Sequence, residues 1–264
     1  MAEQQLISRL TDDQVDSMIT LLLPLDNQLD KRVNYTMNKY HKSKAHALEY
    51  IVTDNPILWA KVYLNWEARD YQKPIILEGK KSKKLVLRLG RRLGKSESMC
   101  ILILWFAYTQ YNKGPNNQYD ILIATPYETQ IDLIFKRLHQ LVDLSPLLTS
   151  LISRDVHHNL CFTINGTTSS ILGLTAGANN SSGGANSSRG QRADVLILDE
   201  CDYIGSNQIT NILNIRTEDP ERIRLICAST PSRKHEEYYK WCQEASKKYH
   251  VTEDNSFNLG IIDK

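Results

Sequence analysis

The sequence predicts an α/β protein with a mostly parallel central sheet flanked by helices, together with a helical N-terminal region and an inserted β-hairpin. Three observations support this fold class. Short, continuously apolar segments alternate with helical ones from residue 84 onward, a rhythm typical of buried parallel strands connected by helices. Residues 1–66 carry helix-start signals instead. Asn165-Gly166 separates two strand-like runs, which is a strong hairpin signal.

Helix-start signals divide residues 1–66 into three predicted helices. Thr11 and the two acids after it can cap a helix that stops near Pro24, because side-chain oxygens accept from the free N–H groups of a first turn. Residues 46–52 form a second, short candidate. Asn55-Pro56 is typical of a capping residue followed by the first helical position, and it predicts the third helix.

The α/β core is predicted to occupy residues 67–264, with strands and helices in alternation. The strands of the parallel sheet are expected to be short and apolar throughout, at 84–89, 120–124, 195–198 and 222–228. Helices are expected at 95–111, 127–142 and 234–245. The hairpin strands, 160–164 and 169–174, are expected as an antiparallel addition. The stretch 175–192 is rich in Gly, Ser and Asn and is interpreted as a functional loop.

Composition restricts the function classes. Apolar residues make up 41% of the chain and charged residues 23%, as in ordinary globular proteins. The formal net charge is only +2, so any DNA contact must come from local patches. The basic stretch 31–44 is interpreted as a solvated linker rather than a DNA-contacting arm, and the lysines at 80–84 as a solvated strand entrance. No apolar run approaches the ~18 residues of a membrane span, and the first residues do not resemble a signal peptide.

Cysteine and histidine spacing gives no metal or disulfide signal. The five cysteines are odd in number and have no C-x-x-C spacing, which favours buried thiols in a reducing compartment. His157 and His158 are the only adjacent histidines. Neighbouring residues on a strand face opposite sides, so we expect them to make a poor metal pair.

The first of two chemical motifs is a strand followed by a phosphate-binding loop and a helix start. Residues 90–96 read Gly-Arg-Arg-Leu-Gly-Lys-Ser. Backbone N–H groups and a helix N-terminus hold anionic phosphate oxygens, while Lys95 would reach the β- and γ-phosphates and Ser96 would ligate Mg²⁺. The loop is imperfect, because Leu89 stands where the usual pattern has its first glycine.

The second motif is a buried strand that ends in two carboxylates, Asp199 and Glu200. Asp199 would hold the Mg²⁺ shell from the strand opposite the loop, and Glu200 could orient and polarise the attacking water. Neither motif is decisive alone. Their joint occurrence in this order predicts a RecA-like P-loop ATPase of the ASCE class, with Mg·ATP at the carboxyl ends of the parallel strands.

Four segments together resemble the ATPase domain of the large terminase subunit, the DNA-packaging motor of tailed bacteriophages and herpesviruses. In chain order they are Tyr71-Gln72, 90–96, 188–200 and 228–232. The resemblance covers roughly residues 66 to 245. The loop is the most discriminating segment, because it lacks the first glycine and is rich in arginine, as in that family.

The resemblance implies a role for each matched residue. Tyr71 would pack against adenine and Gln72 would pair with its edge. Arg91 would act as a cis arginine finger, with Arg92 as the alternative, and Thr230 would sense the γ-phosphate and transmit its state. The residues expected at the nucleotide are Tyr71, Gln72, Gly90, Arg91, Arg92, Leu93, Gly94, Lys95, Ser96, Glu97 and Thr230. Catalysis is expected from Glu200, Arg91 and Lys95, and Mg²⁺ binding from Ser96 and Asp199.

The family also implies partners. These are double-stranded DNA, the portal protein and the small terminase subunit, with a ring homo-oligomer on the procapsid in the host cell cytoplasm and no membrane association. A neighbour's arginine could complete the site, and Arg189 and Arg192 are weak candidates. Complete large terminases continue into a nuclease domain. The acids near Lys264 make no convincing metal set, so we expect the nuclease domain to be absent and the chain not to cleave DNA, which a plasmid-nicking assay with Mg²⁺ or Mn²⁺ checks.

Two alternatives stay open. Asp199-Glu200-Cys201-Asp202 resembles the D-E-x-D box of a superfamily 2 helicase-like ATPase, which would need a second RecA-like domain. A nucleotide-binding structural or regulatory module that does not hydrolyse ATP is compatible with the imperfect loop. Glu200 argues against that module, because a non-hydrolysing binder has no need of a base.

Overall fold

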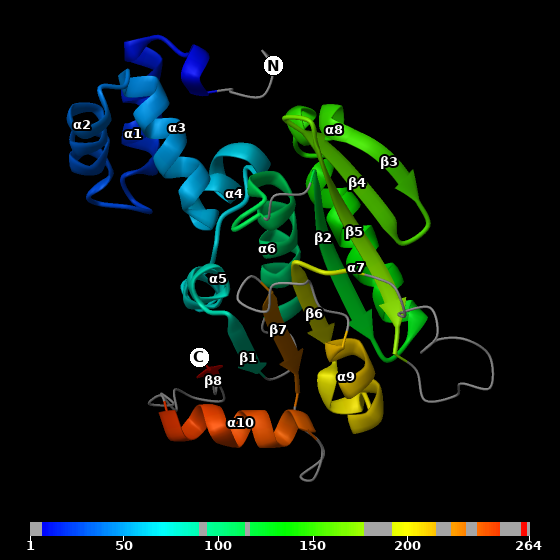
Figure 1. Ribbon diagram of the computed structural model, residues 1–264. Helices are drawn as coiled ribbons and strands as arrows, with labels where there is room; N and C mark the ends of the chain where they lie inside the picture. The colour runs from blue at the N-terminus through cyan, green and yellow to red at the C-terminus, as the bar shows by residue number, and fades with distance from the viewer. Residues whose placement is uncertain are drawn as a thin grey trace. The chain divides into compact units, whose positions relative to one another are not determined.

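The chain forms two compact units, Met1–Ala68 and Arg69–Lys264, which we call the N-terminal unit and the sheet unit. Their elements are labelled in Figure 1. The structure is a computed structural model, and it describes residues 7–89, 94–113, 117–176, 192–214, 223–230, 237–248 and 260–262.

The N-terminal unit is helical, as predicted. Its helices are α1 (Asp12–Leu22), α2 (Leu29–Tyr40), α3 (Lys44–Asp54) and α4 (Pro56–Leu64), after a 3₁₀ turn, η1 (Ile7–Arg9). Thr11 caps α1 in a reciprocal capping box with Gln14. Asn55 caps α4, because its Oδ1 accepts a hydrogen bond from the N–H of Ile57 at 3.0 Å. Both predicted caps are confirmed.

The interpretation of residues 31–44 as a linker was wrong, because α2 occupies most of this stretch. Leu29, Val33 and Thr36 are buried at helical spacing along one side of α2, and burial of such a stripe stabilises a helix whose other faces are polar. Outside that stripe, Arg32 Nη1 pairs with Asp26 Oδ2 at 2.5 Å. The basic side chains of α2 thus belong to an ordered helix.

The sheet unit is built on an eight-stranded sheet in the order β3-β4-β5-β2-β6-β7-β1-β8. The five adjacent strands β5, β2, β6, β7 and β1 run parallel, whereas β3, β4 and β8 pair antiparallel at the two ends. The strand bounds are β1 (Lys84–Arg88), β2 (Gln118–Thr125), β3 (Ile152–Val156), β4 (Asn159–Ile164), β5 (Thr167–Thr175), β6 (Val195–Asp199), β7 (Arg224–Ser229) and β8 (Gly260–Ile262). Every residue of β6 is buried, which explains its uninterrupted apolar sequence.

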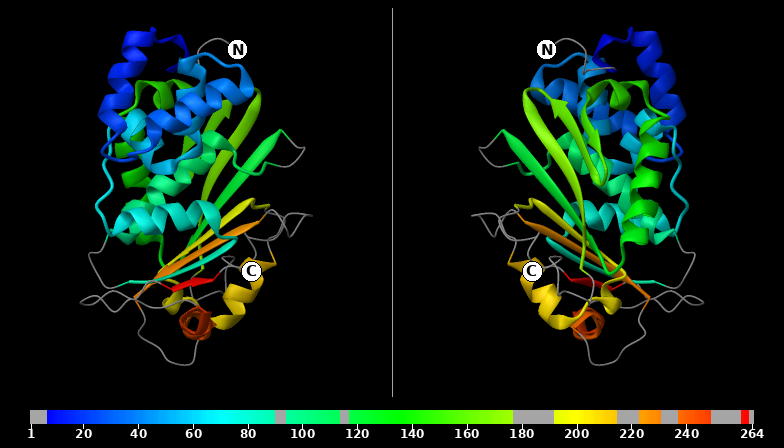
Figure 2. Two further views of the ribbon diagram at one scale, coloured as in Figure 1. Left: turned by 90° about the vertical axis from the view of Figure 1, so that its left-hand side faces the viewer. Right: turned by 90° about the vertical axis from the view of Figure 1, so that its right-hand side faces the viewer.

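Helices cover both faces of the parallel strands. Figure 2 shows α5 (Gln72–Lys81) and α6 (Lys95–Thr109) on one side of the sheet and α9 (Ser206–Leu213) and α10 (Glu237–Lys248) on the other. Helix α7 (Glu128–Val142) packs against β2 and β5 (Figure 1), and α8 (Pro146–Leu151) follows it. The short η2 (Cys201–Tyr203) joins α9 and α10 over the second face. None of these helices, in the part of the chain described, is long and apolar enough to cross a bilayer.

The predicted hairpin is present but is more than an antiparallel addition. Asn165 (φ 51°) and Gly166 (φ 77°) form its turn, as expected where both central residues have positive φ. Strand β5 then pairs parallel with β2 along its whole length, so the second hairpin strand belongs to the parallel part of the sheet. Strand β3, which the sequence analysis did not predict, extends the hairpin outward.

The placement of His157 and His158 on a strand was wrong. They form the turn between β3 and β4, with His158 at φ 54° and the two ring centroids 3.8 Å apart. The argument that strand neighbours face opposite sides therefore does not apply to this pair. The cysteines behave as predicted, because all five are free and buried.

Candidate active site

Three parallel strands end side by side at one edge of the sheet. Arg88 at the end of β1 pairs with Ser229 of β7, and Ala228 of β7 pairs with Asp199 of β6. Parallel strands all have their carboxyl ends at the same edge, so the segments after them converge there. The fold therefore brings together the predicted phosphate loop, the two carboxylates and the Ser229-Thr230 segment.

Only the end of the predicted loop is described. Gly90, Arg91, Arg92 and Leu93 lie outside the described residues, so their roles stay predictions. Gly94 caps α6 with φ 66° and ψ 18°. A Cβ at this position would lie 2.6 Å from Gln72 Nε2, so Gly94 is required both for its backbone conformation and for the close approach of a neighbouring side chain.

Tyr71 and Gln72 lie beside Gly94 at the start of α5. Gln72 is only 4% exposed, and its Oε1 accepts a hydrogen bond from the N–H of Arg69 at 3.0 Å. The hydroxyl of Tyr71 accepts from Arg69 Nη1 at 3.1 Å. The residues expected to contact adenine are thus fixed next to the end of the loop, although they are far from it in the sequence.

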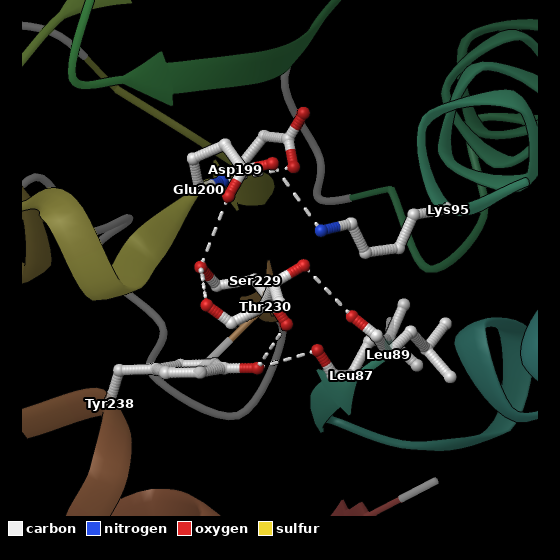
Figure 3. A network of polar contacts seen from close by, with 8 residues as sticks. All are labelled: Leu87, Leu89, Lys95, Asp199, Glu200, Ser229, Thr230 and Tyr238. Atoms are coloured by element: carbon white, nitrogen blue, oxygen red, sulfur yellow. Dashed lines mark hydrogen bonds and ion pairs between the residues drawn. The ribbon is translucent and has the colours of Figure 1, made fainter. Parts of the chain in front are cut away.

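Lys95 contacts Glu200 across the site, as Figure 3 shows. The Nζ of Lys95 lies 3.4 Å from Glu200 Oε1, and the Lys95 side chain is almost fully buried. The hydroxyl of Ser229 donates to the other carboxylate oxygen, Oε2, at 3.2 Å. Glu200 itself has φ 49°, a backbone conformation that is uncommon for non-glycine residues and marks functional sites more often than chance.

Asp199 is a buried carboxylate that needs a cation. It is 5% exposed, and burial, with a smaller contribution from the neighbouring Glu200, raises its pKa to about 6, although Lys95 and a hydrogen bond from Ser96 oppose the rise. A divalent cation would relieve this desolvation. Carboxylate and hydroxyl oxygens are the ligands that Mg²⁺ prefers, so Asp199 and Ser96 fit the predicted Mg²⁺ site.

A second network ties the strand ends to α10 (Figure 3). Thr230 Oγ1 donates to the carbonyl of Leu89 at 3.1 Å, which joins the segment after β7 to the start of the loop. The buried hydroxyl of Tyr238 lies 2.6 Å from the carbonyl of Leu87 and 3.0 Å from that of Ser229. Any movement of the loop or of Thr230 therefore strains a contact that reaches α10.

Sequence reasoning missed several residues of this site. Tyr238 belongs to no motif, and its partners are strand carbonyls distant in the sequence. Ser229 was recognised only as part of a turn, not as a partner of Glu200. Glu97, in the first turn of α6, receives both Arg137 Nε at 2.6 Å and Arg137 Nη2 from α7. No sequence signal could have found these pairs, because each depends on the packing of distant elements.

Arg192, one of the two candidates for an arginine acting on a neighbour, lies at the amino end of β6. Its Nη2 is 3.6 Å from Asp194 Oδ1, whereas Glu200 follows the opposite end of this strand. Arg189 lies outside the described residues. The proposed action of either residue on another subunit stays a prediction.

Residues 86–257 match the sequence profile of the family described as terminase large subunit, T4likevirus-type, N-terminal. No curated protein matches the chain in a sequence search. The matched segment contains β1, the candidate site and α10.

Solved structures with the same fold come from three bacteriophages. The HK97 large terminase is 16% identical with a TM-score of 0.59, over 74% of this chain and 41% of that one. The Thermus phage P74-26 large terminase ATPase domain is 19% identical with a TM-score of 0.52, over 69% and 72%. The large terminase of another thermophilic bacteriophage, in complex with ADP, is 10% identical with a TM-score of 0.51, over 68% and 42%.

These similarities confirm the predicted RecA-like α/β fold with its mostly parallel sheet. The chain spans about two fifths of the length of the HK97 terminase. At these identities the structures establish the fold, and the chemistry of this chain rests on its own residues.

Proposed function

Because the chain belongs to the family of T4-like large terminase subunits, through their N-terminal region, we propose that it is an ATPase that drives double-stranded viral DNA into a procapsid. The observation that carries this proposal is the meeting of Lys95, Asp199 and Glu200 at the carboxyl edge of the parallel strands. A cation, a buried metal-binding carboxylate and a second carboxylate at the loop end are the groups that phosphoryl transfer to water requires.

In the nucleotide-free chain, Lys95 holds Glu200 in an ion pair. The γ-phosphate of ATP carries more negative charge than this carboxylate and would compete for the lysine. Glu200 would then keep its hydrogen bond from Ser229 and gain a free oxygen to orient the attacking water. ATP binding would thereby convert the glutamate from a partner of Lys95 into the catalytic base.

Asp199 and Ser96 would hold Mg²⁺, which supplies charge neutralisation at the β- and γ-phosphates. Arg91, with Arg92 as the alternative, would place a guanidinium against the charge that develops on the transferring group. Tyr71 and Gln72 would hold the adenine beside Gly94, since Gln72 Nε2 lies toward this glycine.

Loss of the γ-phosphate would be read by Thr230. Its hydroxyl is bonded to the carbonyl of Leu89, the residue that precedes the loop, so rearrangement of the loop changes this contact. The hydroxyl of Tyr238 bridges the same strand ends from α10. We propose that this route carries the nucleotide state toward the DNA-gripping surface.

The proposed partners follow the family. They are double-stranded DNA, the portal protein and the small terminase subunit, with a ring of identical subunits on the procapsid in the host cytoplasm. The thermophilic phage terminase in complex with ADP supports nucleotide binding by this fold, and its assignment to this chain is part of the proposal.

The test is steady-state ATP hydrolysis with and without long duplex DNA, comparing the chain with Glu200→Gln. Removing a positioned base is expected to lower kcat by about 10²–10⁴-fold. Glu244→Gln, an exposed glutamate on α10, is the matched control and should leave the rate unchanged. Stimulation by duplex DNA is expected for a translocase.

Other results would favour the alternatives. Unwinding of a forked duplex would favour a helicase-like ATPase. Tight ATP binding without hydrolysis that depends on Glu200 would favour a regulatory module. Hydrolysis unaffected by Glu200→Gln would contradict the assignment of the base.

A further inference from the structure

The turn between β3 and β4 brings two imidazoles against the first turn of α7, away from the candidate active site. Nitrogen atoms of His157 and His158 and a carboxylate oxygen of Glu128 all lie within 4.8 Å of one another. Glu128 and His157 are exposed and His158 is partly buried. These three residues come from two elements that are distant in the sequence, so their meeting is a consequence of the fold.

The backbone of the turn is held firmly against α7. The carbonyl of His158 accepts a hydrogen bond from the N–H of Gly173 at 2.9 Å. Gly173 permits this packing, because a Cβ there would lie 2.5 Å from Ile131 Cγ2 and 2.9 Å from Phe135 Cε2. The ring of His158 lies against that of Phe135, with centroids 5.4 Å apart. The position of His158 is therefore preorganised.

His158 also has a partner that orients its ring. Its Nε2 lies 2.7 Å from Asp132 Oδ1, one helical turn after Glu128 on α7. An imidazole with one nitrogen bonded to a carboxylate has its other nitrogen available as a metal ligand, and histidine ligands of metals commonly have such a second partner. Here the arrangement leaves Nδ1 of His158 for coordination.

The donor set selects the class of metal. Two imidazoles and a carboxylate suit Zn²⁺ and similar transition-metal dications, whereas Mg²⁺ and Ca²⁺ prefer oxygen ligands alone. The carboxylates of Glu128 and Asp132 balance the charge of a dication. The positive end of the α7 dipole opposes a cation by roughly 0.3–1 kcal/mol, and Glu128 in the first turn offsets it.

We propose that Glu128, His157 and His158 form a binding site for a transition-metal dication such as Zn²⁺, with Asp132 as a positioning residue. Zinc ligands lie at about 2.0–2.2 Å from the ion, so the donor atoms must approach one another by small side-chain rotations. The exposed side chains of Glu128 and His157 permit this. A bound ion would fasten the β3–β4 turn to α7.

This site is separate from the candidate Mg²⁺ site. His158 is bonded to Gly173 of β5, which pairs with Ile123 of β2, which in turn pairs with Ile197 of β6. Strands in a sheet lie about 4.8 Å apart. Several strand spacings therefore separate the β3–β4 turn from Asp199 at the end of β6.

The experiment measures Zn²⁺ binding to the untagged chain by competition with a coloured chelator, in millimolar Mg²⁺ to saturate the oxygen-ligand site. We expect one Zn²⁺ bound per wild-type chain and none, or at least tenfold weaker binding, in His157→Ala. His157 is exposed, so this variant should fold normally. The matched control is His139→Asn, because His139 pairs with Asp155 at the same helix–hairpin contact but outside the site.

Further variants separate the roles. Glu128→Gln should weaken Zn²⁺ binding while preserving shape. Asp132→Asn should weaken it by about 10–100-fold without changing the stoichiometry, as loss of a second partner does. Zn²⁺ should raise the Tm of the wild type and of His139→Asn, but not of His157→Ala. Equal Zn²⁺ affinity in the wild type and His157→Ala would overturn the proposal, as would no binding by the wild type.

Discussion

The Nζ of Lys95 lies 3.4 Å from Oε1 of Glu200, so the residue expected to bind phosphate contacts the residue expected to activate water. Both side chains are shielded, since Lys95 is 8% and Glu200 26% exposed at the side chain. A shielded pair is costly to break on one side only, because the remaining charge stays buried. This relationship leads to the first prediction.

Lys95→Ala is expected to destabilise the nucleotide-free chain, because it leaves Asp199 and Glu200 without their cation. The same substitution in a Glu200→Gln background should cost less, with a coupling free energy of about 0.5–3 kcal/mol. Lys95→Ala should also lower kcat/KM for ATP by at least about 10²-fold, as loss of a charge-stabilising donor does. Urea unfolding of the four chains of the cycle measures the coupling, and strictly additive effects would contradict a direct contact.

Asp199 makes the stability of the nucleotide-free chain depend on pH. Burial raises its pKa from 3.8 to about 6, so the folded chain binds a proton that the unfolded chain has released between these values. The stability that this proton confers is complete below about pH 4 and is lost as the pH rises through about 6. Above pH 6 the folded chain holds a buried charge that the unfolded chain would hydrate.

Asp199→Asn should therefore raise the free energy of unfolding of the nucleotide-free chain at pH 8, by on the order of 2–3 kcal/mol. It should have little effect at pH 4 and should abolish Mg²⁺-dependent nucleotide binding. Urea unfolding at both pH values is the measurement. Asp143→Asn, an exposed carboxylate after α7, controls for net charge, and an equal gain from both variants would refute the assignment.

Ser229 is expected to position Glu200, because its hydroxyl donates to Oε2 at 3.2 Å. A hydrogen bond to a charged group contributes about 1.5–3 kcal/mol, so Ser229→Ala should lower kcat by roughly 10–100-fold with little change in KM. Ser98→Ala is a matched control. Ser98 is equally buried, and its hydroxyl has no hydrogen-bond partner among the described residues. A parallel loss of kcat in both variants would point to packing instead.

The parallel sheet was predictable because its strands are buried on both faces and read as continuous apolar runs. The hairpin was predictable because Asn165 and Gly166 satisfy a local conformational requirement. Helix α2 was missed because its buried stripe contains few apolar residues and its N-cap, Gln28, makes no side-chain hydrogen bond. Strand β3 was missed because it lies at the sheet edge and four of its five residues are exposed, so it shows no alternation.

At the candidate site, the carboxylates and Lys95 were predictable because strand order and loop chemistry are local. Their pairing was not, because the contact between Lys95 and Glu200 depends on a register set by the whole sheet. The turn at His157 and His158 was misread for the same reason. Its conformation depends on β3, whose polar sequence gave no signal.

Tyr238 is expected to connect the nucleotide site to α10. Its hydroxyl lies within hydrogen-bonding distance of the Leu87 and Ser229 carbonyls, and burial raises its pKa, so it remains a protonated donor at every working pH. Tyr238→Phe should lower the free energy of unfolding by about 1–2 kcal/mol, because a buried carbonyl loses its donor. It should also reduce the stimulation of ATP hydrolysis by duplex DNA more than the basal rate.

The measurement compares Tm and DNA-stimulated hydrolysis in Tyr238→Phe with those in Tyr239→Phe. Tyr239 is the half-buried neighbour of Tyr238 on α10, so the second variant removes a hydroxyl from the same helix without touching the strand ends. A role confined to stability would lower Tm in Tyr238→Phe and leave the ratio of stimulated to basal rates unchanged. A fall in that ratio at a temperature where both variants are folded would support transmission through this hydroxyl, because only Tyr238 contacts the segment that carries Ser229 and Thr230.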